Sequence, residues 1–322
     1  MVLIITGMDP LKKISIVFSL FNEKEILETL ITRVIETASS IPYHFELIFV
    51  DDGSTDGSDE VIRTIQQKPQ PNVEIMLISL SRNFGHEAAM IAGIDHASGE
   101  AVICMDADLQ HPPEAIPEMI SCFESGYEVV TMIRTKNEGA TRQSGFLSLL
   151  FYRLINKISP FRLQENASDF FLVSKKVAHI LRNNYRERNR FLRGIIQIVG
   201  FRSTSVHYRA SSRQTGKSNY SFFKLSALTL TAITSFSNAP LFLGLWFGCI
   251  FSLASIILGI YTLWTYFFGV TPPSGYTTII LFLSFSFAIL FFLIGIIGMY
   301  VGYLFEEQKN RPIYIVKDEE VT

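Results

Sequence analysis

The chain has 322 residues and a formal net charge of −2. A near-neutral chain offers no excess of basic charge to a nucleic-acid backbone, so nucleic acid is not an expected partner. The charged residues are unevenly distributed, because Asp, Glu, Lys, Arg and His are all absent between Leu225 and Phe305. The composition therefore predicts a polar head followed by a long uncharged segment.

Strand-like and helix-like segments alternate through the first 133 residues. Short apolar runs occupy residues 13–20, 45–51, 73–80, 101–106 and 128–133, and helical periodicity occupies residues 24–39, 57–67, 86–97 and 114–125. Such alternation predicts an α/β fold with a mostly parallel sheet and helices on both faces.

Polar residues follow three of the expected strands. The first strand runs into Asn22 and Glu23, the second into Asp51 and Asp52, and the fourth into Asp106. Ligands of open α/β folds bind in the crevice at the carboxyl ends of the strands. The sequence therefore predicts a nucleotide-binding crevice at these ends.

The most informative strand end is Asp106-Ala107-Asp108, which follows a wholly apolar strand. Carboxylate oxygens suit Mg²⁺ or Mn²⁺, which readily share their coordination shell with substrate phosphates. A solvated turn is the alternative for an isolated pair of this kind. The apolar strand and the acidic end of the second strand favour a metal-diphosphate site.

Residues 240–264 and 278–304 are each long enough to cross a bilayer, since ~20 helical residues span its hydrocarbon core. Buried helices of a soluble core are the alternative, but two adjacent uncharged runs of this length favour membrane spans. Basic residues flank the pair and are absent from the connecting residues 267–277, which predicts that both termini are cytoplasmic. The flanking residues are Arg213, Lys217, Lys224, Lys309, Arg311 and Lys317.

Seven short motifs lie at residues 19–23, 51–54, 79–85, 106–110, 168–170, 187–194 and 236–240. Together they resemble the polyprenyl-phosphate glycosyltransferases, which include bacterial enzymes that make undecaprenyl-phosphate glucose and eukaryotic enzymes that make dolichyl-phosphate mannose. The resemblance covers nearly the whole chain. Its most specific part is the sequence Asp-Ala-Asp-Leu-Gln followed by Pro-Pro-Glu.

The resemblance implies an inverting enzyme of the glycosyltransferase A type in the bacterial inner membrane. Such an enzyme moves a hexose, most often glucose, from a UDP-sugar to undecaprenyl phosphate and so supplies lipid-linked sugar for cell-envelope glycans. It also implies a Mg²⁺ or Mn²⁺ cofactor and a homo-oligomer.

Four regions are expected. Residues 1–140 form a cytoplasmic nucleotide-sugar-binding core, residues 141–238 an acceptor-side segment, residues 239–305 a two-helix transmembrane hairpin, and residues 306–322 a cytoplasmic tail. Residues 141–158 mix apolar and basic side chains, as expected of a helix in a membrane interface, and the helix at 220–238 also approaches the bilayer. A helix facing the protein core is the alternative for 141–158.

The resemblance assigns the donor side of the site residue by residue. Asp51 contacts the nucleoside, with Asn22 and Glu23 nearby. The metal and the donor diphosphate are organised by Asp106, Asp108 and Gln110.

It likewise assigns the acceptor side. Asp169 matches an acidic residue close to the acceptor, and Arg134 matches a basic residue that grips the lipid phosphate. The segment from Arg213 to Lys217 matches a loop that closes over the substrates, and Lys136 lies next to the acceptor cations.

The chain departs from the family pattern at several positions. Relatives usually carry Pro at 19, Asp at 111, Arg at 137, Gly-Asp-Phe-Arg at 168–171 and Lys at 219. This chain carries Ser19, His111, Asn137, Ser168 with Phe171, and Asn219 at these places. Three of these differences remove positive charge from the place where an anionic lipid phosphate docks. Nearby lysines, Lys136 and Lys217, can compensate as flexible point charges. Either the acceptor site is rearranged or the acceptor differs.

The implied reaction is a single in-line displacement with inversion at the anomeric carbon. A lipid phosphate has a second pKa near ~6, so it is already nucleophilic at neutral pH and Asp169 only orients it. With a hydroxyl acceptor such as diacylglycerol, Asp169 would instead act as general base. A catalytically weakened membrane scaffold of the same fold is the alternative from another class of function.

For the remaining histidines and arginines near the motifs, the sequence predicts no catalytic role. His86 is expected at a helix start without a chemical role, and His111 is expected to be solvated or hydrogen-bonded to backbone. The arginines at 186, 188, 190 and 193 are expected to contact anionic headgroups or a lipid phosphate.

Overall fold

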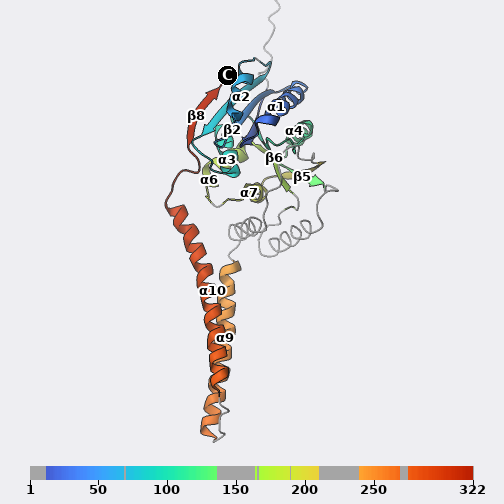
Figure 1. The fold of residues 1–322 in the computed structure, drawn as a ribbon. Helices are drawn as coiled ribbons and strands as arrows, with labels where there is room; N and C mark the ends of the chain where they lie inside the picture. Colours follow the sequence, from blue (N-terminus) through green and yellow to red (C-terminus); the bar gives the residue numbers. More distant parts are fainter. Residues whose placement is uncertain are drawn as a thin grey trace, which may run out of the picture.

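The computed structural model describes residues 12–68, 70–135, 164, 167–188, 190–209, 239–268 and 275–321. They form a head built around a β-sheet and two long helices that run side by side away from it (Figure 1). The expected membrane-interface helices at 141–158 and 220–238 lie outside the described residues.

In the described part of the chain, eight strands form one sheet in the order β7-β5-β6-β4-β1-β2-β3-β8. Strands β1 to β4 run parallel, β6 and β8 are antiparallel to their neighbours, and β5 and β7 are parallel to each other. The strands are β1 (Lys13–Leu20), β2 (His44–Asp51), β3 (Val73–Leu80), β4 (Ala101–Asp106), β5 (Val129–Thr135), β6 (Ala167–Ser174), β7 (Ser203–Arg209) and β8 (Val316–Val321).

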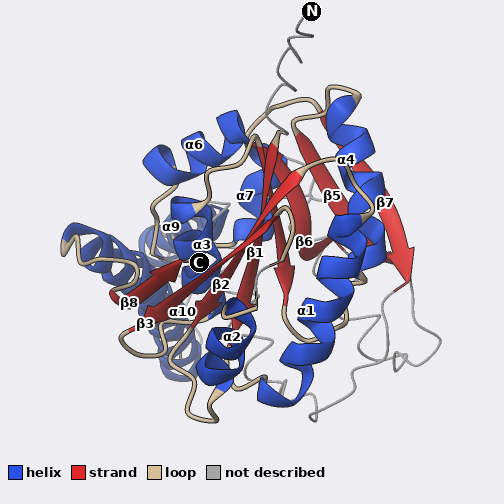
Figure 2. Cartoon of the chain, turned by 90° about the horizontal axis from the view of Figure 1, so that it is seen from above, coloured by secondary structure: helices blue, strands red, loops and turns tan. Residues whose placement is uncertain are grey.

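Helices cover both faces of the sheet, as Figure 2 shows. On one face lie α1 (Lys24–Ser39), α2 (Ser58–Gln66), η1 (Pro113–Ala115) and α4 (Ile116–Glu124). On the other lie α3 (His86–His96), α6 (Lys175–Asn184) and α7 (Leu192–Ile198). The α/β fold predicted from the sequence is confirmed, and the nine elements expected up to residue 133 begin and end within two residues of their predicted limits.

The two faces have separate cores because side chains alternate along each strand. Ile16 and Phe18 of β1 pack with α1, whereas Val17 packs with α3. Helix α3 lies so close to β1 that a Cβ added at Gly93 would come within 2.1 Å of Val17 Cγ1. The same alternation places Ser19 on the α3 side of the sheet.

The sheet extends beyond the region expected to contain it. Strands β6 and β7 lie within residues 141–238, and β8 lies in the segment expected to be only a tail. Strand β8 pairs with β3 from Met76 opposite Val321 to Leu80 opposite Val316. The end of the chain is therefore part of the head.

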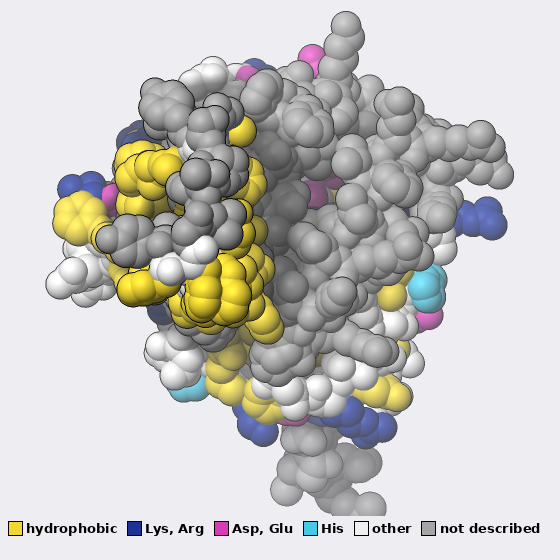
Figure 3. Space-filling view, turned by 90° about the horizontal axis from the view of Figure 1, so that it is seen from below, with side chains coloured by type: hydrophobic (Ala, Val, Ile, Leu, Met, Phe, Trp, Pro, Cys, Tyr) yellow, Lys and Arg dark blue, Asp and Glu magenta, His cyan; other side chains and the backbone are white. Residues whose placement is uncertain are grey.

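Helices α9 (Ala239–Phe267) and α10 (Tyr276–Gln308) pack against each other. Among the described residues, one segment, Leu281–Gln308, is long and apolar enough to cross a membrane, and Trp246–Tyr261 is a shorter apolar stretch. Large hydrophobic side chains such as Trp246 and Phe291 are exposed on this pair. Viewed from below, hydrophobic side chains gather on the pair (Figure 3).

Candidate functional site

The ends of three parallel strands meet at one edge of the sheet. Pairing of β1 with β2 and β4 sets Leu20 opposite Asp51 and Ser19 opposite Asp106. The crevice predicted at the carboxyl ends of these strands therefore has its polar residues side by side.

Hydrogen bonds join the loops that follow β1 and β2. The side-chain oxygen of Asn22, whose φ is 57°, accepts from the backbone N–H of Thr55 at 2.8 Å, and the Asn22 N–H donates to Ser54 Oγ at 2.9 Å. Asp51 accepts from the N–H of Ser54 at 2.9 Å, and burial raises the pKa of its carboxyl. The backbone N–H of Glu23 donates to Ser58 Oγ at 3.1 Å. The three residues assigned to the nucleoside thus lie in one connected loop structure.

Asp52 fixes the start of helix α3. Its buried carboxylate accepts from the backbone N–H groups of Phe84 and Gly85, at 2.6 and 2.8 Å. Gly85 has φ 98°, which an L side chain rarely adopts. The next residue, His86, is the first of α3 and is held at the strand ends by this arrangement.

Antiparallel pairing brings a second carboxylate to Asp106. Cys104 of β4 lies opposite Phe171 of β6 in an antiparallel pair. Asp106, two residues after Cys104, and Asp169, two residues before Phe171, therefore lie at the same end of the sheet. Two carboxylates that are 63 positions apart in the sequence thereby face one another.

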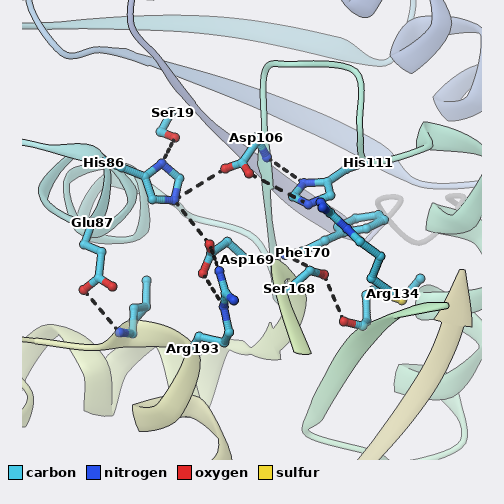
Figure 4. Close-up of polar contacts among 12 residues, drawn as sticks. Ser19, His86, Glu87, Asp106, His111, Arg134, Ser168, Asp169, Phe170 and Arg193 are labelled. Atoms are coloured by element: carbon cyan, nitrogen blue, oxygen red, sulfur yellow. Dashed lines mark hydrogen bonds and ion pairs between the residues drawn. The ribbon is translucent and has the colours of Figure 1, made fainter. Parts of the chain in front are cut away.

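The imidazole of His86 lies between these carboxylates (Figure 4). Its Nε2 is 3.4 Å from Asp106 Oδ1 and 3.8 Å from Asp169 Oδ2, and its Nδ1 is 2.7 Å from Ser19 Oγ. Burial lowers the pKa of His86, but the negative charges of Asp106 and Asp169 outweigh it and leave the pKa above its usual value. A site expected to be acidic thus contains a histidine at its centre.

Asp169 forms a bidentate ion pair with Arg193 of α7. The guanidinium Nε donates to Oδ1 at 3.1 Å, and Nη2 donates to Oδ2. Burial alone would raise the pKa of Asp169, but the charge and hydrogen bonds of Arg193 outweigh it and lower the pKa to about 2. Asp169 is therefore ionised throughout the physiological pH range.

Glu87 of α3, next to His86, has a pKa that is shifted in the opposite direction to that of Asp169. Burial, reinforced by the negative charge of Asp169, raises the pKa of Glu87 to about 7. Its Oε2 accepts from the backbone N–H of Leu192 at 3.2 Å. The carboxyl groups of Glu87 and Asp169 thus have pKa values shifted in opposite directions.

His111 is buried, which corrects the expectation of a solvated side chain, whereas the expected hydrogen bond to backbone is present. Its Nδ1 accepts from the Asp106 N–H at 3.0 Å, and its Nε2 lies 3.8 Å from Asp106 Oδ2. The ring stacks on Phe170 and meets Tyr208 edge-on, with centroids 5.2 and 5.9 Å away. Burial lowers the pKa of His111, so the ring is neutral and braces the Asp106 backbone.

Asp108 and Gln110 lie in the turn after β4. Asp108 Oδ1 accepts from the backbone N–H of Gln110 at 3.0 Å, and Leu109 between them has φ 60°. In the described residues, the group of His, Cys, Asp and Glu atoms close enough to hold one ion is His86, Asp106 and Asp169, all within 4.8 Å. Asp108 is outside that group, and the ligand set Asp106, Asp108 and Gln110 stays a prediction.

The residues present fit a divalent cation. Asp106 Oδ1 is buried and accepts no hydrogen bond from the described part of the chain. A carboxylate oxygen left in this way suits a hard cation such as Mg²⁺ or Mn²⁺, and Asp108, two residues further along the chain, offers a second carboxylate.

The acceptor-side cations are only partly described. Arg134 is at the end of β5, where its Nε donates to Tyr208 Oη at 3.4 Å. Lys136, Arg213 and Lys217 lie outside the described residues, as do Asn137 and Asn219. Arg134, the one acceptor-side cation within the described residues, thus lies beside the Tyr208 ring that packs on His111.

Three of the four arginines expected at a membrane surface have protein partners, whereas Arg190 Nη1 is buried without a hydrogen-bond partner among the described residues. Arg186 binds Asp95 at 2.8 Å, and Arg193 binds Asp169 as described above. The Arg188 N–H donates to Glu307 of α10 at 2.6 Å. This segment joins α3, α7 and α10 to one another.

Sequence reasoning missed two contributors to the site, His86 and Ser19, and one pairing, that of Arg193 with Asp169. His86 was expected to have no chemical role, and the contact of Ser19 with it was not foreseen. The position of His86 directly after the motif at residues 79–85 was the available signal. The Arg193 pair could not be found from local pattern, because its partner lies on a strand 24 residues away.

Comparison with known proteins shows the family. The model of the family described as "Glycosyl transferase family 2" matches residues 15–181. The chain belongs to glycosyl transferase family 2.

Full-length relatives have consistent names. The chain is 36% identical over 308 residues to a bactoprenol glucosyl transferase of Shigella phage SfV, covering 95% of this chain and 99% of the relative. It is 34% identical over 306 residues to a prophage bactoprenol glucosyl transferase homolog of Escherichia coli K12, covering 95% and 98%. It is also 36% identical over 303 residues to the uncharacterized glycosyltransferase YkcC of Bacillus subtilis, covering 94% and 93%.

Solved structures resemble part of this chain. Mannosyl-3-phosphoglycerate synthase from Rubrobacter xylanophilus has a TM-score of 0.49 at 14% identity, covering 69% of this chain and 72% of that one. Glucosyl-3-phosphoglycerate synthase from Mycobacterium tuberculosis, solved with Mn²⁺ and UDP-glucose, has a TM-score of 0.46 at 18% identity, covering 69% and 79%.

Proposed function

We propose that the protein is an inverting glycosyltransferase that moves glucose from UDP-glucose to a polyprenyl phosphate such as undecaprenyl phosphate. The reaction takes place at the cytoplasmic face of the bacterial inner membrane and supplies lipid-linked glucose for cell-envelope glycans. The names of the bactoprenol glucosyl transferases that match this chain over nearly their full length support both the sugar and the acceptor.

The ion pair of Asp169 with Arg193 is the observation that carries the choice of acceptor. A hydroxyl acceptor needs a general base, and a carboxylate whose pKa is held at about 2 is a poor one. A phosphate acceptor is mostly a dianion at neutral pH and needs no base. The geometry therefore favours a lipid phosphate over diacylglycerol, with Asp169 orienting the acceptor side.

On the donor side, the connected loops holding Asn22, Glu23 and Asp51 bind the nucleoside. Asp106, Asp108 and Gln110 hold Mg²⁺ or Mn²⁺ together with the donor diphosphate. When bound, the cation supplies positive charge against the charge that develops on the departing UDP. The buried Asp106 Oδ1, which accepts no hydrogen bond from the described residues, supports this assignment.

On the acceptor side, Arg134, Lys136, Arg213 and Lys217 bind the lipid phosphate. Cations are the appropriate partners, since charge-assisted hydrogen bonds to phosphate are about twice as strong as neutral ones. Arg134 is directed to this region by its strand and by its contact with Tyr208, whose ring packs against His111.

Helices α9 and α10 form a transmembrane hairpin. Strand β8 follows α10 and pairs with β3 of the head, which precedes α9. The chain must therefore cross the bilayer an even number of times between them. Because Leu281–Gln308 is long enough to cross once, the pairing supports a second crossing through α9.

The proposal is tested with membranes that contain the full chain. Labelled UDP-glucose, UDP-N-acetylglucosamine and GDP-mannose are each incubated with undecaprenyl phosphate or with diacylglycerol, and the lipid products are analysed by mass spectrometry. We expect undecaprenyl-phosphate glucose, formed only with added Mg²⁺ or Mn²⁺.

Other products would select the alternatives. Glucosyl-diacylglycerol as the main product would overturn the phosphate acceptor. No product from any pair, with UDP-glucose still bound, would favour the scaffold function. A detergent-solubilised sample examined by light scattering tests the expected homo-oligomer.

A further inference from the structure

His86 occupies the space between the donor and acceptor ends of the site. Its Nε2 is within 4 Å of one oxygen from each carboxylate, Asp106 Oδ1 on the donor side and Asp169 Oδ2 on the acceptor side. Its side chain is 41% exposed at the carboxyl ends of the strands. One ring nitrogen therefore connects the two halves of the site (Figure 4).

Ser19 sets the orientation of this ring. Its Oγ is 2.7 Å from Nδ1, and Ser19 is opposite Asp106 on the neighbouring strand. A ring nitrogen facing two carboxylates carries the proton, because a lone pair there would be repelled by both. In the neutral form of the ring, Nδ1 accepts from the Ser19 hydroxyl, and Nε2–H lies on the side of the two carboxylates.

Asp169 already has a strong partner on its other side. Arg193 donates to both of its oxygens. A guanidinium directly against a carboxylate disfavours a divalent cation on the same group through charge repulsion. The contact of His86 with Asp169, at 3.8 Å, is therefore an electrostatic contact rather than half of a metal site.

We propose that His86, oriented by Ser19, is a positioning residue that holds the carboxylates of Asp106 and Asp169 at a fixed separation, an inference that rests on the proposed glycosyl transfer. In that role the imidazole sets the distance between the group that organises the donor diphosphate and the group that orients the acceptor. Histidine contributes through Nε2–H without contacting the reacting atoms.

Two amide variants of His86 test the contributions of its two ring nitrogens one at a time. The amide of asparagine reaches the place of Nδ1 and that of glutamine the place of Nε2, so His86→Asn keeps only the Ser19 contact and His86→Gln keeps a donor to the carboxylates. We expect kcat to fall about tenfold in His86→Asn and to stay within about threefold in His86→Gln, with little change in the KM for either substrate.

A double-mutant cycle tests the part played by Ser19. Ser19→Ala should lower kcat about threefold in the wild-type background and cause no further loss in His86→Ala, since the hydroxyl acts only through the ring. Thermal unfolding of every variant in detergent shows whether the chain still folds. Independent, additive losses would remove Ser19 from the proposal.

A second readout needs no acceptor. Mn²⁺ binding is measured by electron paramagnetic resonance on the full chain, with and without UDP. Loss of the contact that orients Asp106 should weaken Mn²⁺ binding about tenfold in His86→Asn, and His86→Gln should restore it. Bound Mn²⁺ should show no directly coordinated imidazole nitrogen.

The outcomes are distinct. An imidazole nitrogen signal that disappears in His86→Ala would make His86 a metal ligand and overturn the positioning role. Wild-type kcat and Mn²⁺ affinity in His86→Asn, or equal losses in the Asn and Gln variants, would also overturn it. If wild-type protein transfers no sugar to undecaprenyl phosphate, the proposed function fails, while the Mn²⁺ measurement still decides the role of His86.

Discussion

Asp169 keeps its charge in a mostly buried place because Arg193 binds both of its oxygens. Asp106 has a different environment. The imidazole of His86 lies near its Oδ1 and that of His111 near its Oδ2, and Oδ1 accepts no hydrogen bond from the described residues. The two carboxylates can therefore face each other, one neutralised by a fixed cation and the other left for a ligand. At the scale of single residues, charge compensation decides which group does which task.

Asp108 is the residue whose assignment depends most on the metal. We expect Asp108→Asn to lower metal-dependent transfer by roughly a hundredfold, because a neutral amide cannot balance the charge of the cation. Initial rates across a Mg²⁺ titration measure the loss. Asp318→Asn on β8 is the matched control and should keep wild-type rates. Near-normal activity of the Asp108 variant in saturating Mg²⁺ would place the metal elsewhere.

Glu87 predicts a dependence of stability on pH. Its pKa is raised to about 7 in the folded protein, against about 4.3 in an unfolded chain. The folded state therefore binds more protons between these values, and stability falls as pH rises from about 5 to 8, on the order of 1–3 kcal/mol from this group.

The Glu87→Gln variant tests this assignment. Glutamine keeps an acceptor for the Leu192 N–H but cannot ionise, so the midpoint of thermal unfolding should drop less between pH 5 and pH 8 than in the wild type. Glu118→Gln is the control because this side chain is exposed in the first turn of α4. An unchanged pH profile would show that Glu87 ionises normally.

At the scale of elements, β8 is the addition that joins the end of the chain to the head. It covers the edge of β3, and Arg63 of α2 binds its Glu320 at 2.9 Å. The segment before it is held as well, since Tyr314 donates to Asp95 of α3 at 2.8 Å. Helix α3 carries His86 at its other end.

Deletion of residues 315–322 should therefore destabilise the head. Several strand hydrogen bonds are lost, each contributing about 0.5–1.5 kcal/mol, and the exposed edge of β3 promotes aggregation. We expect the unfolding midpoint to fall by roughly 4–8 °C. Lys317→Ala, whose side chain is 67% exposed on β8, is the control and should have little effect. Normal stability after the deletion would show that β8 contributes little to the fold.

At the scale of the whole molecule, β8 also restricts the topology. The head and the end of the chain share one sheet, so they lie on the same side of any membrane that α9 and α10 enter. Arg188 adds a direct contact between the head and α10 through Glu307. The head is thus joined to the C-terminal end of α10.

Cysteine labelling tests this topology. In a version without native cysteines, a cysteine placed within residues 272–275 should react with an impermeant reagent from outside intact cells, and cysteines at 215 and 318 should react only after lysis, because basic flanks remain cytoplasmic. Mass shift on a gel reports the reaction. Labelling of position 215 from outside would place the head on the wrong side for a cytoplasmic nucleotide sugar.

Local pattern was sufficient for much of this protein. The period of apolar residues specified the strands and helices up to residue 133, and the position of Asp51 and Asp106 directly after apolar strands placed both at the crevice. The absence of charge from Leu225 to Phe305 likewise indicated the two long helices. These features depend on neighbours in the chain, which a sequence displays directly.

Tertiary structure alone decided which side chains meet. Antiparallel register between β4 and β6 brings Asp169 to Asp106, the packing of α3 on β1 brings His86 to Ser19, and α7 supplies Arg193. The pairing of β8 with β3 was equally hidden in a charged segment that resembles a tail. Strand register and helix packing join residues dozens of positions apart, and periodicity carries no information about such partners.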